Sequence, residues 1–342
     1  MKKNATIDEV AALAGVSRAQ TARALRGDPC VRPETRERVR AAARTLSYRT
    51  NVAARALSEA HSRSVGILIG EPLNPYHLIL GQAVDAALAA IGLDAIVSLR
   101  AVTDAATATE VDRLASFRAL GLILIDTPRD PAAVREAAQH LPCVYIGSTP
   151  VHHGIAVVDT DNTAGIRLAI DHLVALGHQH IVHIGGRSEG DMQERATAYT
   201  ARMQEAGLAP RAWHGKNDID TGRRGVDALL AMAPRPTAIV AANDVIAIGA
   251  IDRLHGLGLK VPDDISVIGF DDIPAAASET WSLTTVRQDT AALADAAVAA
   301  LQRLIRPAGA EATDATEASE DASCTRLPVA LVVRRSSARP GK

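Results

Sequence analysis

Cysteine and aromatic residues are scarce in this sequence of 342 residues. The three cysteines, Cys30, Cys143 and Cys324, are widely spaced and odd in number, so they fit neither a disulfide framework nor a CxxC metal knuckle. Aromatic residues make up only 2% of the chain, so a ligand site must rely on charged and amide groups. No apolar run approaches the roughly 18 residues of a membrane helix, and the start MKKNATIDEVAALAG lacks the apolar core of a secretion signal. We therefore expect a cytoplasmic protein with no membrane partner.

Positive and negative charges nearly balance over the whole chain, but they are separated along it. The 37 Lys and Arg against 39 Asp and Glu give a net charge of −2, which by itself argues against a uniformly basic nucleic-acid binder. Residues 1–64 carry 13 basic and 6 acidic residues, a net +7, and the remainder carries a net −9. Such asymmetry predicts a polyanion-binding module joined to an acidic globular part.

The N-terminal 50 residues are predicted to form short helices. Val10 and Ala14 lie at helical spacing, and Thr6 with Glu9 forms a capping-box pattern. Gly15 tolerates the positive φ of a tight turn before the next helix. The expected helices cover residues 7–14 and 18–25, and a third begins at residue 33.

From residue 64 onward, short β-branched runs alternate with Ala- and Leu-rich helical stretches. This alternation predicts parallel sheets covered by helices on both faces, and the length predicts more than one sheet. We expect the chain to switch between lobes near residues 159–162 and 287–290. Residues 307–323 hold five acidic residues and no basic one, which predicts a disordered surface loop. The expected strands are 65–69, 95–99, 121–125, 144–146, 156–158, 181–184, 238–241, 267–269 and 329–333, and the expected helices are 78–91, 164–176, 196–206, 245–257 and 291–305.

Long segments of the sequence resemble one family of bacterial transcription regulators. ATIDEVAALAGVS, followed by VRPETRERVRAAARTLSYRTNVAARALS, resembles the DNA-binding headpiece and hinge of the LacI/GalR family. DHLVALGHQHIVHIGG, PTAIVAANDVIAIGAIDRLHGLGLKVPDDISVIGFDDIP, LTTVRQD and LPVALVVRRS resemble, in order and spacing, the family's periplasmic-binding-protein-like sensor. The resemblance spans roughly residues 5–337.

The resemblance implies a three-part architecture. An all-α helix-turn-helix headpiece would occupy residues 1–50, and a hinge helix and linker residues 51–63. Residues 64–342 would form the ligand-binding and dimerisation domain, an α/β sensor of two doubly wound parallel-sheet lobes of the type I periplasmic-binding-protein-like kind. The family works as a homodimer on a palindromic DNA operator, which fits the charge split. Residues 335–342 are too short for the heptad helix that makes some relatives tetrameric, so we expect a dimer.

The resemblance places the second headpiece helix in the major groove of DNA. Arg18, Ala19 and Arg23 occupy positions that usually face base edges in the family, and arginine can bond guanine O6 and N7 in a bidentate way. Gln-Thr-Ala at residues 20–22 replaces a frequent Thr-Val-Ser run, and Arg26 stands where Asn is frequent, so we expect a shifted footprint with Arg26 on a phosphate. The alternative is that the arginines form only a solvated basic face. The predicted headpiece contacts to DNA are Thr6, Ser17, Arg18, Ala19, Gln20, Arg23 and Arg26.

The hinge segment, residues 51–58, resembles the family segment that becomes helical when two protomers meet on DNA. Leu57 matches a leucine that wedges between base pairs from the minor groove and kinks the duplex. Ala54 is small enough for paired hinge helices to pack closely, and Arg55 would lie near phosphates. The alternative is a flexible linker with incidental Ala and Leu residues. The predicted hinge contacts to DNA are Asn51, Ala54, Arg55 and Leu57.

The resemblance also implies a small-molecule effector in the cleft between the sensor lobes. Arg195 matches an arginine that reaches sugar hydroxyls or a purine. Asn243 and Asp271 lie at strand ends, where parallel α/β sheets usually hold ligands. We expect Asp244 to cap the following helix rather than touch the ligand. The predicted ligand-binding residues are Asn74, Tyr76, Arg195, Asn243, Asp271 and Gln288.

Departures from the family pattern bear on which effector is bound. Gly147 stands at a position that is often charged, and residues 218–224 lack the aromatic that some relatives use for stacking. Tyr76, Tyr199 or Trp281 could supply a stacking ring instead, although a lone aromatic more often packs in the core. A sugar or sugar derivative is the family-level expectation, and a nucleobase or nucleoside is the second candidate.

Catalytic and metal constellations are not expected. Four histidines, at positions 172, 178, 180 and 183, lie across a helix end and the next strand, where alternate side chains point in opposite directions. Gly185-Gly186 is not a phosphate-binding loop, and no Ser/His/Asp arrangement with supporting context occurs. We therefore predict a ligand-responsive repressor associated with the nucleoid, without enzymatic activity, cofactor or metal. The alternatives are a metabolite-binding module that does not regulate DNA and a sensor-fold enzyme.

Overall fold

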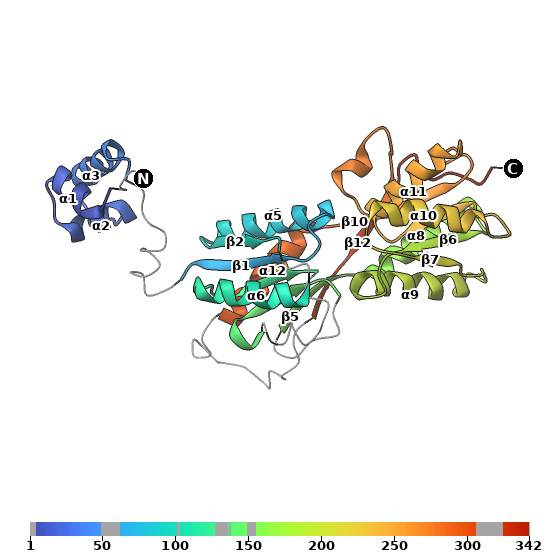
Figure 1. Ribbon diagram of the computed structural model, residues 1–342, viewed down its shortest axis with the longest axis horizontal. Helices are drawn as coiled ribbons and strands as arrows, with labels where there is room; N and C mark the ends of the chain where they lie inside the picture. Colours follow the sequence, from blue (N-terminus) through green and yellow to red (C-terminus); the bar gives the residue numbers. More distant parts are fainter. Residues whose placement is uncertain are drawn as a thin grey trace. The chain divides into compact units, whose positions relative to one another are not determined.

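The computed structural model describes residues 5–48, 62–100, 103–126, 136, 138–148, 155–305 and 324–341 (Figure 1). These residues fall into two compact units, of which one ends at Ser62 and the other begins at Arg63. The hinge contacts predicted at Asn51, Ala54, Arg55 and Leu57, and the acidic segment 307–323, lie outside the described residues. Within the described part, no helix is long and apolar enough to cross a membrane.

The N-terminal unit is a small helical domain. Thr6 caps the first helix in a capping box with Glu9, and Gly15, with φ of +67°, ends it in the left-handed conformation. Ser17 caps the second helix by accepting a hydrogen bond from the backbone N–H of Gln20. The helices are α1 (Ile7–Ala14), α2 (Arg18–Arg26) and α3 (Pro33–Thr45), and their shared core consists of Val10, Ala14, Ala24, Val31, Val39 and Ala42.

The second unit contains two sheets, one in each lobe. In lobe 1 the strand order is β11-β5-β4-β3-β1-β2 and all neighbours are parallel. In lobe 2 the order is β12-β10-β9-β8-β6-β7, and only β12 is antiparallel to its neighbour. The lobe 1 strands are β1 (Ser64–Ile69), β2 (Asp94–Ser98), β3 (Leu122–Ile125), β4 (Cys143–Ile146), β5 (Ile155–Thr160) and β11 (Cys324–Leu327). The lobe 2 strands are β6 (Ile181–Gly185), β7 (Ala212–His214), β8 (Ala238–Ala241), β9 (Ser266–Asp271), β10 (Thr284–Gln288) and β12 (Val329–Val332).

Helices cover both faces of each sheet, which confirms the doubly wound fold class. In Figure 1, α5 and α6 lie on opposite sides of β1, and α9 lies on the opposite side of the lobe 2 sheet from α10 and α11. The lobe 1 helices are α5 (Pro75–Ala90), α6 (Asp104–Ser116) and α12 (Thr290–Ile305). The lobe 2 helices are α8 (Asn162–Leu176), α9 (Gly190–Glu205), α10 (Ile219–Leu230), α11 (Asp244–Gly256) and the short 3-10 helix η1 (Pro274–Ala277).

The chain passes between the lobes at three places in the described residues. It leaves lobe 1 between β5 and α8, returns between β10 and α12, and crosses again between β11 and β12. The third passage was not predicted, and it explains the antiparallel strand. Strand β11 runs parallel to the other lobe 1 strands toward the interface, and after Pro328 the chain enters lobe 2 against the direction of β10. The carboxyl ends of the parallel strands of both lobes therefore face the same interlobe region.

Candidate functional site

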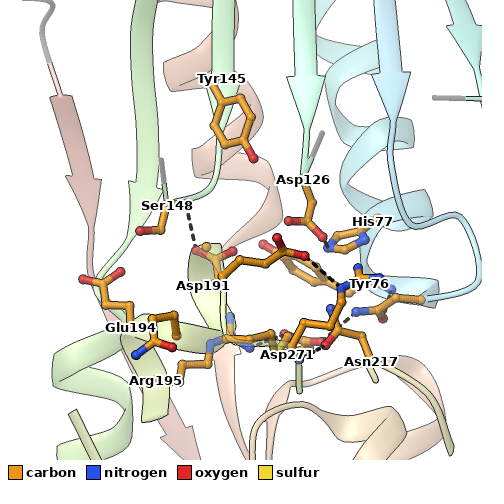
Figure 2. A pocket seen from close by; sticks show the side chains of 16 residues that line it. Tyr76, His77, Asp126, Tyr145, Ser148, Asp191, Glu194, Arg195, Asn217 and Asp271 are labelled. Carbon is orange, nitrogen blue, oxygen red and sulfur yellow. Dashed lines mark hydrogen bonds and ion pairs between the residues drawn. The ribbon is translucent and has the colours of Figure 1, made fainter. Parts of the chain in front are cut away.

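A cavity of about 480 Å³ lies between the two lobes (Figure 2). Four of the predicted ligand residues, Asn74, Tyr76, Arg195 and Asp271, line it. Gln288 lines a narrower adjoining pocket, and Asn243 lines neither. Lobe 1 supplies Asn74, Tyr76, His77, Asp126, Tyr145 and Ser148 to the cavity wall, and lobe 2 supplies Arg187, Glu189, Gly190, Asp191, Met192, Gln193, Glu194, Arg195, Asn217 and Asp271.

Helix starts and strand ends place these side chains at the cavity. Asn74 is the N-cap of α5 and accepts a hydrogen bond from the backbone N–H of Tyr76, while Pro75 fits the first turn of that helix. Asp271 ends β9 with a φ of +120°, a conformation that L-residues rarely adopt. Backbone strain of this kind persists where the surroundings over-determine it, and it is concentrated at functional sites.

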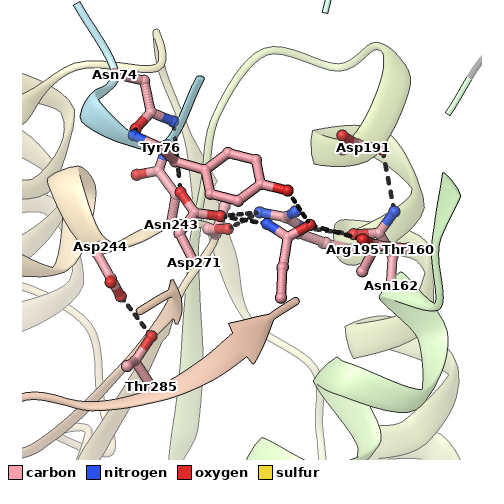
Figure 3. A network of polar contacts seen from close by, with 12 residues as sticks. Asn74, Tyr76, Thr160, Asn162, Asp191, Arg195, Asn243, Asp244, Asp271 and Thr285 are labelled. Carbon is pink, nitrogen blue, oxygen red and sulfur yellow. Dashed lines mark hydrogen bonds and ion pairs between the residues drawn. The ribbon is translucent and has the colours of Figure 1, made fainter. Parts of the chain in front are cut away.

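A buried hydrogen-bond network joins the two lobes beside the cavity (Figure 3). The Tyr76 hydroxyl donates to Oε1 of Gln288 at 2.9 Å, and the Thr160 hydroxyl donates to the same oxygen at 2.7 Å. Gln288 in turn donates through Nε2 to Oδ1 of Asp271 at 2.7 Å, and Asn74 donates to Oδ2 of Asp271 at 3.4 Å. Gln288, at the end of β10, thus links polar side chains of both lobes.

Arg195 is the most heavily engaged side chain of the site, with only 2% of its surface exposed. Its Nε donates to Oδ1 of Asn162 and one terminal nitrogen donates to the carbonyl oxygen of Ala242, both at 2.7 Å. The same nitrogen lies 3.5 Å from Oδ1 of Asp271, and the guanidinium carbon lies 3.7 Å from the centre of the Phe270 ring. Burial raises the pKa of Asp271, and the charge of Arg195 opposes that rise. Arg195 and Asp271 therefore form a buried ion pair in the wall of the cavity.

The turn after β8 places Asn243 and Asp244 differently from the prediction. Asn243, not Asp244, is the N-cap of α11, and its Oδ1 accepts from the backbone N–H of Ile246 at 2.9 Å. The expectation that Asp244 caps this helix was wrong, because Asn and Asp cap equally well and only the backbone shows which one precedes the first turn. Asp244 instead accepts hydrogen bonds from the Thr285 hydroxyl at 2.5 Å and from the backbone N–H of Ile273 at 2.9 Å. Burial and the nearby Asp271 raise its pKa.

The side-chain nitrogen of Asn243 is buried and has no hydrogen-bond partner among the described residues. An unpaired buried amide costs free energy. Figure 3 shows Asn243 next to Asp271, at the edge of the interlobe network. Asn243 lines neither pocket, so the ligand-binding role predicted for it stays a prediction.

The aromatic side chains that line the cavity are only partly those that the sequence suggests. Tyr76 lines it, but Tyr199 is buried in lobe 2 with its hydroxyl donating to the carbonyl oxygen of Ile181 at 3.0 Å. The indole N–H of Trp281 points to Asp252, at 3.4 Å, and Trp281 is not part of the cavity wall. Tyr145, which the sequence-based prediction missed, lines the cavity from the end of β4.

Acidic residues at the cavity were also missed by the sequence-based prediction. Asp159, at the end of β5, lies with Asp191 and Glu194 of α9 so that one carboxylate oxygen from each is within 4.8 Å of the others. We call these three residues the acidic trio. Asn162 donates to Asp191 and to Glu194, at 3.0 Å each, and Arg326 lies 3.5 Å from Asp159 and 3.4 Å from Glu194. Burial, together with the charges of Asp191 and Glu194, raises the pKa of Asp159 from 3.8 to about 7.

The raised pKa of Asp159 predicts how its replacement by asparagine changes stability with pH. The folded protein keeps a proton on Asp159 that the unfolded chain releases. The contribution of Asp159 to the free energy of unfolding is therefore present below about pH 4 and is lost as the pH rises through about 7. Asp159→Asn, measured by thermal unfolding, should therefore raise the melting temperature more at about pH 8 than at about pH 5. The same gain at both pH values would contradict the buried-carboxylate assignment. Asp171→Asn, at a half-exposed carboxylate, is the matched control.

A second cluster of charged groups, which includes the lining residues Arg187 and Glu189, joins the two lobes. Glu71 of lobe 1 forms an ion pair with Arg187 of lobe 2 and accepts a hydrogen bond from the Asn217 amide at 3.0 Å. Arg187 also lies 3.1 Å from Glu189. These contacts are a second link between the lobes, besides the network at Gln288.

Three of the four histidines at positions 172, 178, 180 and 183 have separate hydrogen-bond partners. His172 bonds the hydroxyl of Ser337, His178 bonds the Thr237 hydroxyl and the carbonyl oxygen of Ala338, and His183 bonds the carbonyl oxygen of Val240. Burial lowers the pKa of His183 to about 3. Among the described residues, the groups with metal-ligand spacing are the acidic trio and Glu71–His77–Asp126, and these histidines are in neither.

The helical unit presents a basic face on α2. Thr21 and Ala24 pack into its core, so the other sides of α2 are exposed. The hydroxyls of Thr6 and Ser17 accept hydrogen bonds at the starts of α1 and α2. The exposed residues predicted to contact DNA on this helix are Arg18, Ala19, Gln20, Arg23 and Arg26.

Comparisons with known proteins agree with both units. Residues 6–51 match the family "Bacterial regulatory proteins, lacI family", and residues 170–337 match a periplasmic binding protein-like domain. The transcriptional repressor PurR of Pectobacterium carotovorum is 30% identical over 341 residues, which cover 98% of this chain and 97% of that protein.

Two solved structures extend the comparison. The Lac repressor dimer bound to operator and an anti-inducer superposes with a TM-score of 0.81 at 26% identity, covering 98% of this chain and 100% of that one. The complex of the regulator CelR with cellobiose gives a TM-score of 0.70 at 27% identity, with the same coverage of both chains. The family resemblance seen in the sequence is thereby confirmed, and the chain belongs to the LacI family of bacterial transcriptional regulators.

Proposed function

We propose that this protein is a repressor that binds a palindromic DNA operator as a homodimer and changes its operator affinity when a small metabolite binds between the sensor lobes. The observation that carries the proposal is the interlobe cavity, whose wall is built from side chains of both lobes. A ligand there contacts both lobes at once, so its binding free energy depends on how the lobes are arranged. Such a regulator acts on the chromosome and therefore works in the cytoplasm.

DNA recognition is assigned to α2 and to the hinge. Ser17 caps the start of α2, and the exposed Arg18, Ala19 and Arg23 are the groups proposed to face base edges. Arg26 is proposed to contact a phosphate. Thr6 and Gln20 complete the proposed headpiece contacts, and the hinge contacts are those predicted from the sequence.

The effector acts through linkage between two sites. If ligand and operator favour different lobe arrangements, each changes the affinity of the other by the same factor. The network from Tyr76 through Gln288 to Asp271 crosses between the lobes, so a ligand that engages it selects one arrangement. The sign of the response, induction or co-repression, follows from the dimer state that the ligand selects.

A sugar or sugar derivative is the first candidate effector. The cavity offers hydroxyl, amide, carboxylate and guanidinium groups, which together donate to and accept from polyol hydroxyls. The structure of the regulator CelR, which has the same architecture, was solved as a complex with cellobiose. A nucleobase or nucleoside is the second candidate, for which Tyr76 supplies a ring at the cavity wall. The proposal assigns no catalytic residue, cofactor or resident metal.

The proposal is tested by a mobility-shift titration of the full chain on palindromic operator DNA at low and moderate salt. A regulator that makes about six to ten phosphate contacts loses roughly 10³- to 10⁵-fold in affinity between about 50 and 200 mM salt. We expect detectable binding at low salt and a steep loss as the salt concentration rises. No binding at low salt would contradict the proposed role as a DNA-binding regulator. It would leave the alternative of a metabolite-binding module without DNA regulation. A scrambled duplex of equal length is the control.

A further inference from the structure

We propose that Asp8 is a positioning residue for DNA recognition, because its carboxylate directs Arg18 toward base edges and keeps that arginine off the DNA phosphates. The inference rests on the proposed function, in which α2 lies in the major groove and Arg18 faces a base. It concerns an acidic residue of a different helix, α1, which is not among the DNA contacts predicted from the sequence.

The backbone of Arg18 is held in place, whereas its side chain is free of the core. Arg18 is the first residue of α2, directly after the N-cap Ser17. The carbonyl oxygen of Ser17 accepts hydrogen bonds from the backbone N–H and the hydroxyl of Thr21, at 2.9 and 3.1 Å, and Thr21 is fully buried. The Arg18 side chain is 72% exposed. Its direction is therefore set by charged neighbours rather than by packing.

Asp8 is the acidic neighbour of this guanidinium among the described residues. Its Oδ2 lies 3.6 Å from a terminal nitrogen of Arg18. Glu9, the other acidic residue in the first turn of α1, accepts a hydrogen bond from the backbone N–H of Thr6 at 2.7 Å in the capping box. A cation at the start of a helix is unfavourable to the helix dipole, and the charge of Asp8 offsets this effect at Arg18. The pair thus joins the first turns of α1 and α2.

The other two arginines of α2 lack such a partner. Arg23 and Arg26 are exposed, and neither forms an ion pair with a described residue. An arginine without an acidic neighbour is attracted to phosphates, which are the sequence-independent part of a protein–DNA interface. Arg18 differs, because any phosphate that it contacted would come close to the carboxylate of Asp8, and like charges repel.

Arginine chemistry allows Arg18 to bind Asp8 and a guanine at the same time. The planar guanidinium has five N–H donors, so an ion pair at one terminal nitrogen leaves donors for guanine O6 and N7. In water, an exposed ion pair of this kind contributes little to stability. In a DNA interface that excludes water the same charges interact more strongly, so we expect the pair to affect recognition rather than folding.

The test compares the full chain with its Asp8→Asn variant on two duplexes, by fluorescence anisotropy over a range of salt concentrations. One duplex is selected by the wild type from a random library, and the other is a scrambled duplex of equal length. Asp8→Asn frees Arg18 for a phosphate, so affinity for the scrambled duplex should rise. The slope of log affinity against log salt should steepen there by about 0.9, the value for one added phosphate contact. The ratio of selected to scrambled affinity should fall about 10-fold.

Three further variants separate this role from a general effect of charge. Glu34→Gln is the matched control, because Glu34 is exposed, is the second residue of α3 as Asp8 is of α1, and forms no ion pair with a described residue. It changes the net charge equally and should affect both duplexes alike. Asp8→Glu keeps the charge and should keep most of the ratio. In an Arg18→Ala background, Asp8→Asn should no longer change the ratio.

The outcomes distinguish the inference from the proposed function. A damaged fold would lower affinity for both duplexes, which is opposite to the rise expected on the scrambled one. A ratio in Asp8→Asn equal to that of the wild type, or a change that persists in the Arg18→Ala background, would overturn the inference and leave the proposed function intact. Absence of wild-type binding to any duplex at low salt would contradict the proposed function, and the inference with it.

Discussion

Replacing Arg195 by alanine is expected to abolish the stabilisation that an effector gives the full chain. A ligand at about 100 times its dissociation constant should stabilise the wild type by roughly 2.7 kcal/mol. Arg195 lies at the cavity wall and holds Asp271 and Asn162 in place, so its loss removes both a ligand contact and the orientation of its neighbours. The measurement is the effector-dependent shift in melting temperature.

The same substitution should also destabilise the empty protein. It leaves the Asp271 carboxylate buried without its cationic partner, and breaking such a pair costs about 3–5 kcal/mol. At about 2–4 °C per kcal/mol for a domain of this size, the melting temperature should fall by roughly 10 °C. Arg195→Lys keeps the charge and loses the planar fork and the stacking on Phe270, so it should fold and still bind effector weakly. An effector shift that is unchanged in either variant would refute the cavity assignment.

Replacing Arg23 by alanine should weaken binding to the specific operator much more than binding to random DNA. Arg23 is exposed on α2, and a bidentate pair with guanine contributes about 1–3 kcal/mol of discrimination. The specific affinity should therefore fall by about 10- to 100-fold, measured by fluorescence anisotropy on operator and scrambled duplexes. Arg44→Ala removes an equal charge from α3, where Arg44 pairs with Glu37 on the surface, and serves as the matched control.

The comparison between the two duplexes decides what Arg23 does. Equal losses on operator and scrambled DNA would assign it to a phosphate and contradict the base-reading role. No loss on either would leave α2 with only a solvated basic face.

Much of the fold follows from the pattern of apolar residues. Strands β3, β6 and β8 are buried along their whole length and β1 in all but its first residue, so a continuous apolar run, rather than an alternating pattern, identifies them. Strands β7, β10 and β11 were missed because they are short or carry polar residues, as in Ala-Trp-His and Cys-Thr-Arg-Leu. The pairing of β11 with β5 and of β12 with β10 depends on the crossings between lobes, which local sequence does not encode.

The candidate ligand site was also only partly predictable from the sequence, because some of its residues come together only in the fold. Asn74, Tyr76, Arg195, Asp271 and Gln288 were found through family-matched motifs, and the structure brings them together. Asp159, Asp191 and Glu194 carry no such motif, because each alone reads as a strand end or a helix start. Only the fold, which brings the end of β5 close to the start of α9, reveals them as a cluster. Tyr145 was missed because a tyrosine within a buried strand is usually a core residue.

Selection of operator DNA from a random duplex library by the full chain tests the central claim most directly. The account predicts that repeated rounds at moderate salt enrich a near-palindromic sequence, because two α2 helices related by the dimer symmetry read two half-sites. The enriched duplex should then bind the Arg23→Ala variant less tightly than the wild type. A bound pool with no enriched sequence, or enrichment of a single site without two-fold symmetry, would contradict the account.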